Sequence, residues 1–284
     1  MSANICFLVS EKQKYIFPFV YRKLSYFYAM NYLFRLLLLL IILSGCANEP
    51  TLSFSPEAFT ETQLEICKTE ACSSIAINYP KANGDPFISE KINNVISNYI
   101  IQGLFLGDDS APSAKTIEQA AKDFILAYRD HQPDMPTDLD FGGYEAEISV
   151  RESYENEQIV SLECTLFLFT GGAHGYGGTS YLNFDLATGA LIENVNLFVN
   201  YPEFEAYAET KFKEAQGIPK NDNINASGFW FENDTFYLSE TIGFDQENLL
   251  IIYNSYEISS YAAGPIVLEI PLTEVAPFLD PTLL

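Results

Sequence analysis

The chain has 284 residues and a formal net charge of −23, and 48% of its residues are hydrophobic and 14% aromatic. This apolar content is enough for the core of one large domain or two small ones, and it argues against a disordered chain. The acidic balance excludes binding to the phosphate backbone of nucleic acids, because like charges repel.

The first 45 residues have the pattern of an export signal. Arg35 precedes an unbroken apolar run, 36–43, which is too short to span a bilayer. The run ends in Leu-Ser-Gly-Cys46, which resembles the lipobox of bacterial lipoproteins, in which the cysteine is lipidated and becomes the N-terminus. Met30 offers a later start that would give a signal of ordinary length, and an ordinary signal peptide that happens to meet a cysteine is the alternative.

Removal of residues 1–45 takes away five basic and one acidic side chain, which leaves a formal charge of −27. We therefore expect an acidic extracytoplasmic protein, anchored through lipid at Cys46 to the outer or the cytoplasmic membrane of the cell envelope. Residues 46–63 contain two prolines and no clear periodicity, which predicts a tether.

Three cysteines follow the anchor. Cys67 and Cys72 are close in sequence, and in an oxidising compartment we expect them to form a disulfide. Cys164 shares the parity of the apolar residues of its strand, which predicts a buried free thiol.

Helical and strand patterns follow each other in the next hundred residues. In chain order they predict a strand, two helices and an antiparallel pair of strands, at 75–79, 87–105, 112–129, 144–151 and 158–169. An acidic loop, 131–143, precedes the pair. Its aspartates lack the spacing of a Ca²⁺-binding loop, so we interpret it as solvated and expect no metal site.

A glycine-dense corner around His174 follows these strands. Such a density of glycine indicates positive φ angles or close approach of the backbone to another group. Aromatic side chains beside glycines at a strand end suit recognition of a glycan or a protein. We predict a binding site there, made of Gly171, Gly172, His174, Gly175, Tyr176 and Tyr181. The alternative is a structural imidazole that holds the corner by bonding carbonyl groups.

The remainder predicts a further strand at 179–186, a helix at 200–217, strands at 229–231, 236–239, 249–253 and 265–270, and a closing helix at 272–279. Helices and strands are segregated along the chain. This arrangement predicts an α+β fold with antiparallel β-sheets and helices packed on one side.

Three segments resemble the PdaC/RsiV family of extracytoplasmic proteins: GGAHG at 171–175, NFDLATG at 183–189 and YEISSYAAGP at 256–265. The resemblance implies two consecutive subdomains, a PdaC-like N-terminal domain over 64–176 and an RsiV-like C-terminal domain of unknown function over 177–284. It also implies binding at the cell envelope, with a lysozyme-like protein or a peptidoglycan glycan as the ligand.

The chain departs from the catalytic members of this family. A deacetylase metal site needs several histidines, whereas only His131 and His174 exist here. No Gly-x-Ser-x-Gly motif occurs either. We therefore expect a binding or sensing module with no catalytic residues and no cofactor. The alternative is an envelope hydrolase, related to polysaccharide deacetylases or glycosidases, that acts through carboxylates.

Overall fold

The computed structural model describes residues 52–70, 72–107, 111–134 and 143–284, all within one compact unit, residues 50–284. The predicted signal peptide, the lipidation at Cys46 and most of the acidic loop 131–143 lie outside the described residues. Among the helices that are described, none is both long and apolar enough to cross a membrane.

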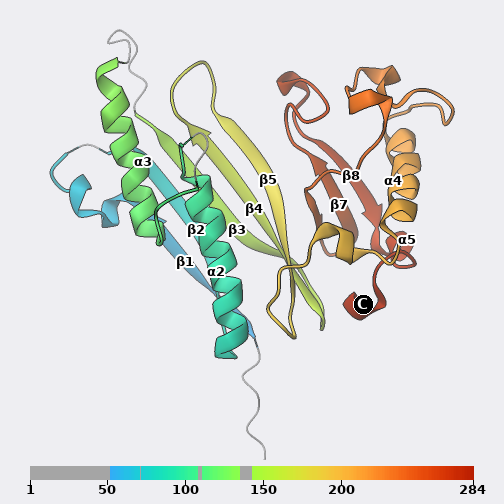
Figure 1. Cartoon of the computed structure of the whole chain (residues 1–284), viewed down its shortest axis with the longest axis horizontal. Helices are drawn as coiled ribbons and strands as arrows, with labels where there is room; N and C mark the ends of the chain where they lie inside the picture. Colours follow the sequence, from blue (N-terminus) through green and yellow to red (C-terminus); the bar gives the residue numbers. More distant parts are fainter. Residues whose placement is uncertain (1–51, 71, 108–110, 135–142) are drawn as a thin grey trace, which may run out of the picture. The chain divides into compact units, whose positions relative to one another are not determined.

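A mixed five-stranded sheet forms the first half of this unit (Figure 1). Its strands are adjacent in chain order: β1 (Ser53–Thr60), β2 (Ser74–Asn83), β3 (Glu145–Glu155), β4 (Ile159–Phe169) and β5 (Tyr176–Asp185). All neighbours are antiparallel except β2 and β3, which are parallel. A parallel pair needs a long crossover connection, and here that connection contains two helices.

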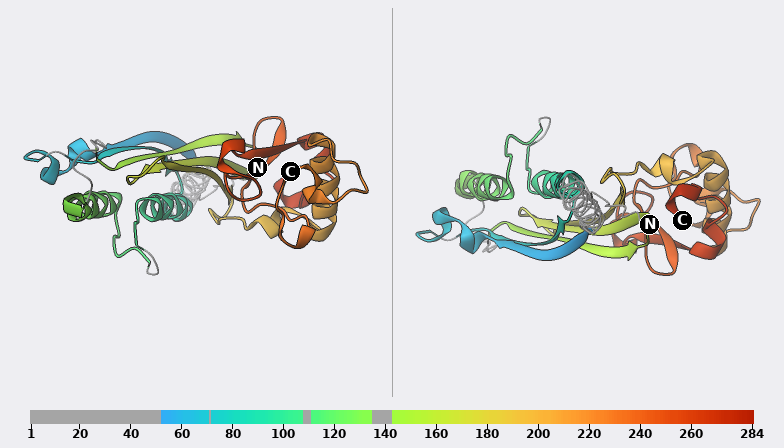
Figure 2. Two further views of the ribbon diagram at one scale, coloured as in Figure 1. Left: turned by 90° about the horizontal axis from the view of Figure 1, so that it is seen from above. Right: turned by 90° about the horizontal axis from the view of Figure 1, so that it is seen from below.

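The two crossover helices, α2 (Pro86–Gly103) and α3 (Ile117–His131), cover one face of the sheet (Figure 2). Asp85 caps α2 by accepting from the backbone N–H groups of Phe87 and Ile88, and Thr116 caps α3 by accepting from that of Gln119. The buried helix residues meet the apolar parity of the strands. The core includes Ile75, Ile77, Ile92, Ile96, Ile100, Phe124, Ile148, Leu162 and Cys164.

A three-stranded antiparallel sheet forms the second half, with strands β6 (Ile242–Phe244), β7 (Asn248–Tyr253) and β8 (Ile266–Pro271). Helix α4 (Tyr201–Ala215) and the short α5 (Leu272–Val275) contact β8. Its core is rich in aromatic residues, among them Phe204, Phe212, Phe231, Phe236 and Tyr253. The predicted α+β class with two subdomains is therefore confirmed, although the first sheet is mixed and not purely antiparallel.

Several local predictions were wrong. Residues 53–60, which we assigned to a tether, form the edge strand β1. Residues 229–231 and 236–239 are not strands, although Phe231 and Phe236 are buried in the core. The closing helix ends at Val275, four residues earlier than predicted. Strand β5 begins at Tyr176, the last residue of the expected first domain, and the chain leaves the first sheet after Asp185.

The second sheet contacts strands β4 and β5 of the first through hydrogen bonds between side chains and backbone groups. The Asn183 amide donates to the carbonyl of Ile242 at 2.9 Å. In the same region, the N–H of Phe244 donates to Ser161 Oγ at 3.2 Å. Strand β6 has only three residues, but it contacts both β4 and β5 and so connects the two cores.

Cys67 and Cys72 form a disulfide, with their Cα atoms 5.4 Å apart. Arg129 of α3 covers the loop that it closes. The guanidinium donates to the Ile66 carbonyl at 3.0 Å and forms an ion pair with Glu70 at 3.0 Å. The disulfide thus fixes a short segment against the C-terminal turn of α3.

Candidate functional site

The corner between β4 and β5 has the unusual backbone geometry that its glycines predict. Gly171 and Gly172 have φ angles of 96° and 94°, which glycine adopts easily and other residues rarely do. Gly175 is required for a different reason. A Cβ atom there would lie 2.5 Å from the ring of Phe167 and 2.9 Å from the carbonyl oxygen of Leu168. The ring of Phe167 therefore lies directly against the glycine backbone.

His174 lies at the start of a row of aromatic rings. Its imidazole stacks on the ring of Tyr261, with centroids 4.4 Å apart and planes 20° apart. Tyr261 in turn contacts Tyr256 at 5.5 Å and 30°. We call these three residues, His174, Tyr261 and Tyr256, the aromatic ladder. All three are exposed, with 41% of Tyr261 and 55% of Tyr256 open to solvent.

The carbonyl group of Gly175 contacts two members of the ladder, His174 and Tyr261. The Gly175 carbonyl oxygen lies 3.0 Å from His174 Nδ1 and accepts from the Tyr261 hydroxyl at 3.5 Å. The predicted structural role of His174 and its predicted place on a binding surface are therefore compatible, since one ring nitrogen holds the corner while the ring face stays in the stack.

The loop that carries the two tyrosines, residues 254–264, is held against β5. Asn254 accepts from the N–H of Thr179 at 2.8 Å and donates to its carbonyl at 2.9 Å. Within the loop, Tyr256 has a φ of 75°. Bulky side chains rarely adopt this left-handed conformation, so the loop holds Tyr256 in a strained position.

Two of the predicted site residues have different surroundings. Tyr176 is 55% exposed and lies beside this loop, because a Cβ on Gly178 would contact both the Tyr176 hydroxyl and the Asn254 amide. Tyr181 instead points toward the second sheet. A Cβ on Gly243 would lie 2.0 Å from its ring, so the ring covers that glycine.

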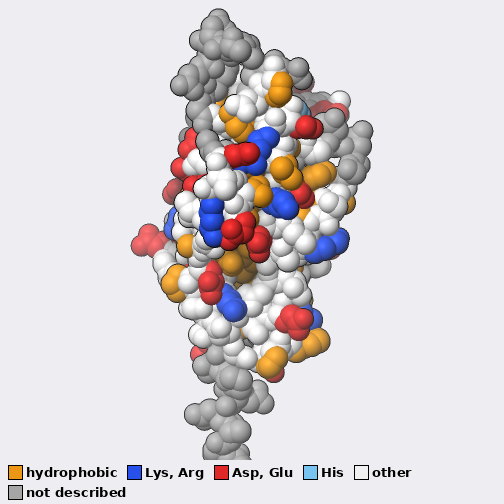
Figure 3. Space-filling view, turned by 90° about the vertical axis from the view of Figure 1, so that its left-hand side faces the viewer, with side chains coloured by type: hydrophobic (Ala, Val, Ile, Leu, Met, Phe, Trp, Pro, Cys, Tyr) orange, Lys and Arg blue, Asp and Glu red, His pale blue; other side chains and the backbone are white. Residues whose placement is uncertain are grey.

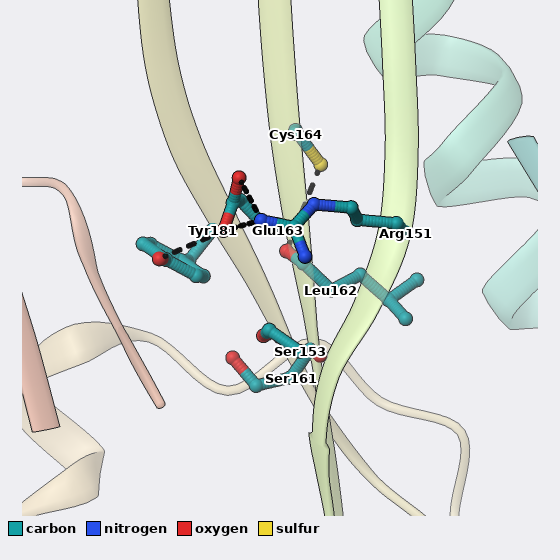
Figure 4. Close-up of polar contacts among 7 residues, drawn as sticks. All are labelled: Arg151, Ser153, Ser161, Leu162, Glu163, Cys164 and Tyr181. Carbon is teal, nitrogen blue, oxygen red and sulfur yellow. Dashed lines mark hydrogen bonds and ion pairs between the residues drawn. The ribbon is translucent and has the colours of Figure 1, made fainter. Parts of the chain in front are cut away.

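Tyr181 belongs to a cluster of polar contacts with Glu163 and Arg151 (Figure 4). Arg151 Nη2 donates to both carboxylate oxygens of Glu163 at 2.8 Å, and the Tyr181 hydroxyl donates to the same carboxylate at 3.4 Å. Burial and the neighbouring Glu163 carboxylate raise the pKa of Tyr181. The phenol is therefore neutral at physiological pH, and the Glu163 carboxylate is paired with Arg151.

The last quarter of the sequence, which supplies both tyrosines of the ladder, is acidic. Residues 221–284 contain ten acidic side chains and no Lys, Arg or His. Trp230 is 47% exposed in this region, and its indole N–H donates to the carbonyl of Glu257, the residue after Tyr256. On the face that lies at the left of Figure 1, by contrast, acidic and basic side chains are interspersed (Figure 3).

The remaining reactive groups are arranged for structure. No three His, Cys, Asp or Glu side chains among the described residues are grouped as metal ligands. His131 Nδ1 lies 2.8 Å from the Tyr144 hydroxyl, beside a cavity of about 290 Å³ between α2 and α3 that is lined mainly by apolar residues. Cys164 is buried and free as predicted, and burial raises the pKa of its thiol, which makes it unreactive.

Sequence reasoning missed Tyr256, Tyr261 and Trp230 as members of this surface. Tyr256 and Tyr261 belong to the YEISSYAAGP segment, so the resemblance marked the segment as unusual. Nothing local in the sequence places it next to His174, more than eighty residues earlier.

Family comparisons divide the chain into the two parts that the resemblance predicts. Residues 66–176 match the family described as deacetylase PdaC, and residues 196–273 match a protein family of unknown function, DUF3298. The chain therefore has the architecture of a PdaC domain followed by a DUF3298 domain, which indicates an envelope-associated protein.

Solved structures of DUF3298 proteins share the fold. A member from Bacteroides fragilis has a TM-score of 0.62 at 17% identity and covers 83% of this chain and 96% of its own. One from Pseudomonas aeruginosa has a TM-score of 0.53 at 13% identity, covering 84% and 98%. A curated relative, the ATPase histone chaperone YTA7 of Saccharomyces cerevisiae, is 33% identical over 88 residues. That match spans 30% of this chain but 6% of the relative, so it carries no argument about function.

Proposed function

We propose that this protein is a lipid-anchored envelope protein that binds a basic, lysozyme-like protein through the aromatic ladder, without catalysing a reaction. The observation that carries the proposal is the ladder itself: three exposed rings in sequence, His174, Tyr261 and Tyr256, supplied by two loops. Aromatic faces attract the ammonium and guanidinium groups of lysine and arginine, and tyrosines are enriched where proteins bind each other.

The strain at Tyr256 supports a role in binding. A glycine or asparagine at a φ of 75° would fold at lower energy than a tyrosine. More than half of the ring is exposed to solvent, so its burial contributes little to offset the strain. Strained residues of this kind are concentrated at functional sites.

The charge of the surrounding sequence favours a basic partner over a glycan. Ten acidic and no basic residues between 221 and 284 attract a cationic protein and accelerate its association. An uncharged glycan would gain nothing from this charge. At the Glu163 cluster the carboxylate is engaged by Arg151 and Tyr181, and this proposal assigns it no catalytic role.

The test is binding of lysozyme to the membrane-extracted protein, measured as association and dissociation rates at low and physiological salt. We expect saturable binding whose association rate falls as salt rises, and a loss of affinity of tenfold or more in Tyr261→Ala. Leu126→Ala is a matched control, because Leu126 on α3 is 43% exposed, close to the 41% of Tyr261. It should bind as the unmodified protein does.

Three other outcomes contradict the proposal or redirect it. Absence of lysozyme binding at low salt would exclude the basic partner. Binding of peptidoglycan fragments that is lost in Tyr261→Ala would identify a glycan ligand for the same surface. Release of acetate or reducing sugar from peptidoglycan would support the hydrolase.

The lipid anchor has its own test. The intact mass of the membrane-extracted protein should show an acylated N-terminus at Cys46, and a water-soluble product that begins elsewhere would exclude the lipid anchor.

A further inference from the structure

We infer that the end of the domain where β1 and α2 begin lies against the lipid bilayer, with the side chain of Phe87 inserted at the membrane surface. This inference rests on the proposed lipid anchor at Cys46. It concerns a different surface from the aromatic ladder and a different partner, the bilayer itself.

The length of the connection limits where this end lies. Six residues separate Cys46 from Ser53, the first residue of β1. Even fully extended, the seven steps from Cys46 to Ser53 span no more than about 25 Å. Strand β1 begins at once and is paired along its full length with β2, so no further slack separates the lipid from the folded domain.

The start of α2 lies at the same end. Ser53 pairs with Asn83, the last residue of β2, and α2 begins three residues later at Pro86. Figure 1 shows the first residues of β1 and of α2 at the same end of the sheet, opposite the C-terminal end of α3. Residues in the first turn of α2 are therefore held close to the bilayer by the fold.

Phe87 in that first turn has the largest exposed fraction of any large hydrophobic side chain described, 67%. Its N–H donates to the capping carboxylate of Asp85 at 2.9 Å, so the cap fixes the backbone while the ring projects from the domain. A phenyl ring so exposed on a rigid element is favourable where lipid can cover it, and aromatic side chains are enriched at the membrane surface.

Lys91, one helical turn further, completes the surface. Its ammonium lies 4.1 Å above the centroid of the Phe87 ring and donates to the Thr188 carbonyl at 3.0 Å. An ammonium beside an inserted ring is placed to meet lipid phosphates. Asp85 and Glu90 are nearby in sequence, so the ring and not the charge must carry most of the contact. One ring suffices when a covalent lipid already holds the domain at high effective concentration.

The test uses the full protein, purified from membranes and reconstituted in phosphatidylethanolamine–phosphatidylglycerol vesicles with and without brominated lipid. Trp230 is the single tryptophan, so Trp230→Phe gives a silent background. In this background, Phe87→Trp should show blue-shifted emission and at least twofold quenching by brominated lipid, which persists at high salt. Leu126→Trp is the matched control, since Leu126 is also exposed and lies in the C-terminal half of α3. It should show neither effect.

The mass of the N-terminus is measured on the same preparation. If the protein is acylated and Phe87→Trp is unquenched, or is quenched no more than Leu126→Trp, the membrane contact is wrong while the anchor stands. If the N-terminus carries no lipid, the anchor fails, and the membrane contact that rests on it is withdrawn.

Discussion

The side-chain amide of Asn254 pairs with the backbone of Thr179 in both directions, accepting from its N–H at 2.8 Å and donating to its carbonyl at 2.9 Å. Asn93 of α2 does the same with Ala82 in β2, at 2.8 and 2.9 Å. In each case the side-chain amide makes the two hydrogen bonds that a neighbouring strand would make, at a position where no strand lies on that side. The first of these pairs holds the tyrosines of the aromatic ladder next to His174.

Replacement of Asn254 by Ala should therefore loosen the ladder as well as the fold. We expect a loss of about 1–3 kcal/mol in the free energy of unfolding, because two backbone groups of Thr179 lose their partner. Asn93→Ala should cost a similar amount through Ala82. Only Asn254→Ala should also weaken lysozyme binding beyond what its stability explains. Equal binding by both variants would show that the loop does not depend on this contact.

At position 256, a glycine variant should be more stable than an alanine variant, which is the reverse of the usual order of stability. Because Tyr256 has a φ of 75°, Ala there retains the left-handed strain, whereas Gly removes it. We expect the free energy of unfolding of Tyr256→Gly to exceed that of Tyr256→Ala by about 1 kcal/mol. The glycine variant should therefore unfold at a higher denaturant concentration. Both variants should bind lysozyme more weakly. A more stable Ala variant would mean that the loop relaxes in solution.

Gly243→Ala tests the contact between the two sheets. The added methyl group would lie 2.0 Å from the Tyr181 ring and must displace it from Glu163. Overpacking of this kind costs about 1–3 kcal/mol. In a Tyr181→Ala background the same change should cost little, since the three atoms nearest to the new Cβ all belong to that ring. Equal costs in both backgrounds, measured by chemical denaturation, would place the clash elsewhere.

The partly buried phenol of Tyr99 should make the fold sensitive to alkaline pH. Burial raises the pKa of Tyr99 from 10.0 to about 12. The unfolded chain therefore loses this proton from pH 10 upward, while the folded protein keeps it until about pH 12. Stability should be complete below pH 10 and fall between pH 10 and 12, by up to about 1.4 kcal/mol per pH unit. Tyr99→Phe should have a shallower decline in urea titrations over this range, and an unchanged slope would contradict the assignment.

The disulfide between Cys67 and Cys72 should stabilise the protein only modestly. Closing a loop this short restricts the unfolded chain by roughly 2 kcal/mol. Peptide mapping of protein from native membranes should recover the linked peptide without reductant and two alkylated thiols with it. Free thiols in the unreduced sample would contradict the assignment. Arg129→Ala should expose the loop and accelerate its reduction, because the guanidinium covers it.

The sequence determined those features whose interactions are local. Thr116 and Asn200, residue types that favour helix N-termini, cap α3 and α4 by accepting from N–H groups three residues away. The disulfide joins cysteines five residues apart. The alternation in β4 was visible because one face packs against helices and the other does not. The positive φ angles at Gly171 and Gly172 likewise followed from residue type alone.

The tertiary structure decided what depends on distant partners. Strand β1 was not predicted because it is an edge strand that contains Pro56 and has no fully buried residue, so it shows no hydrophobic alternation. The aromatic segments 229–231 and 236–239 resemble strands in sequence, yet Phe229, Phe231 and Phe236 pack around the ring of Phe212 and not in a sheet.

The site shows the same division. His174 was predicted from its glycines, but Tyr261 reaches it only because Asn254 holds a loop against the outer edge of β5. Tyr181 has the same residue type and lies close to His174 in sequence, yet it covers Gly243 between the two sheets. Residue type and spacing determine which local conformations have low free energy. Which side chains meet depends on how the two cores pack, and that is set by contacts between residues far apart in the chain.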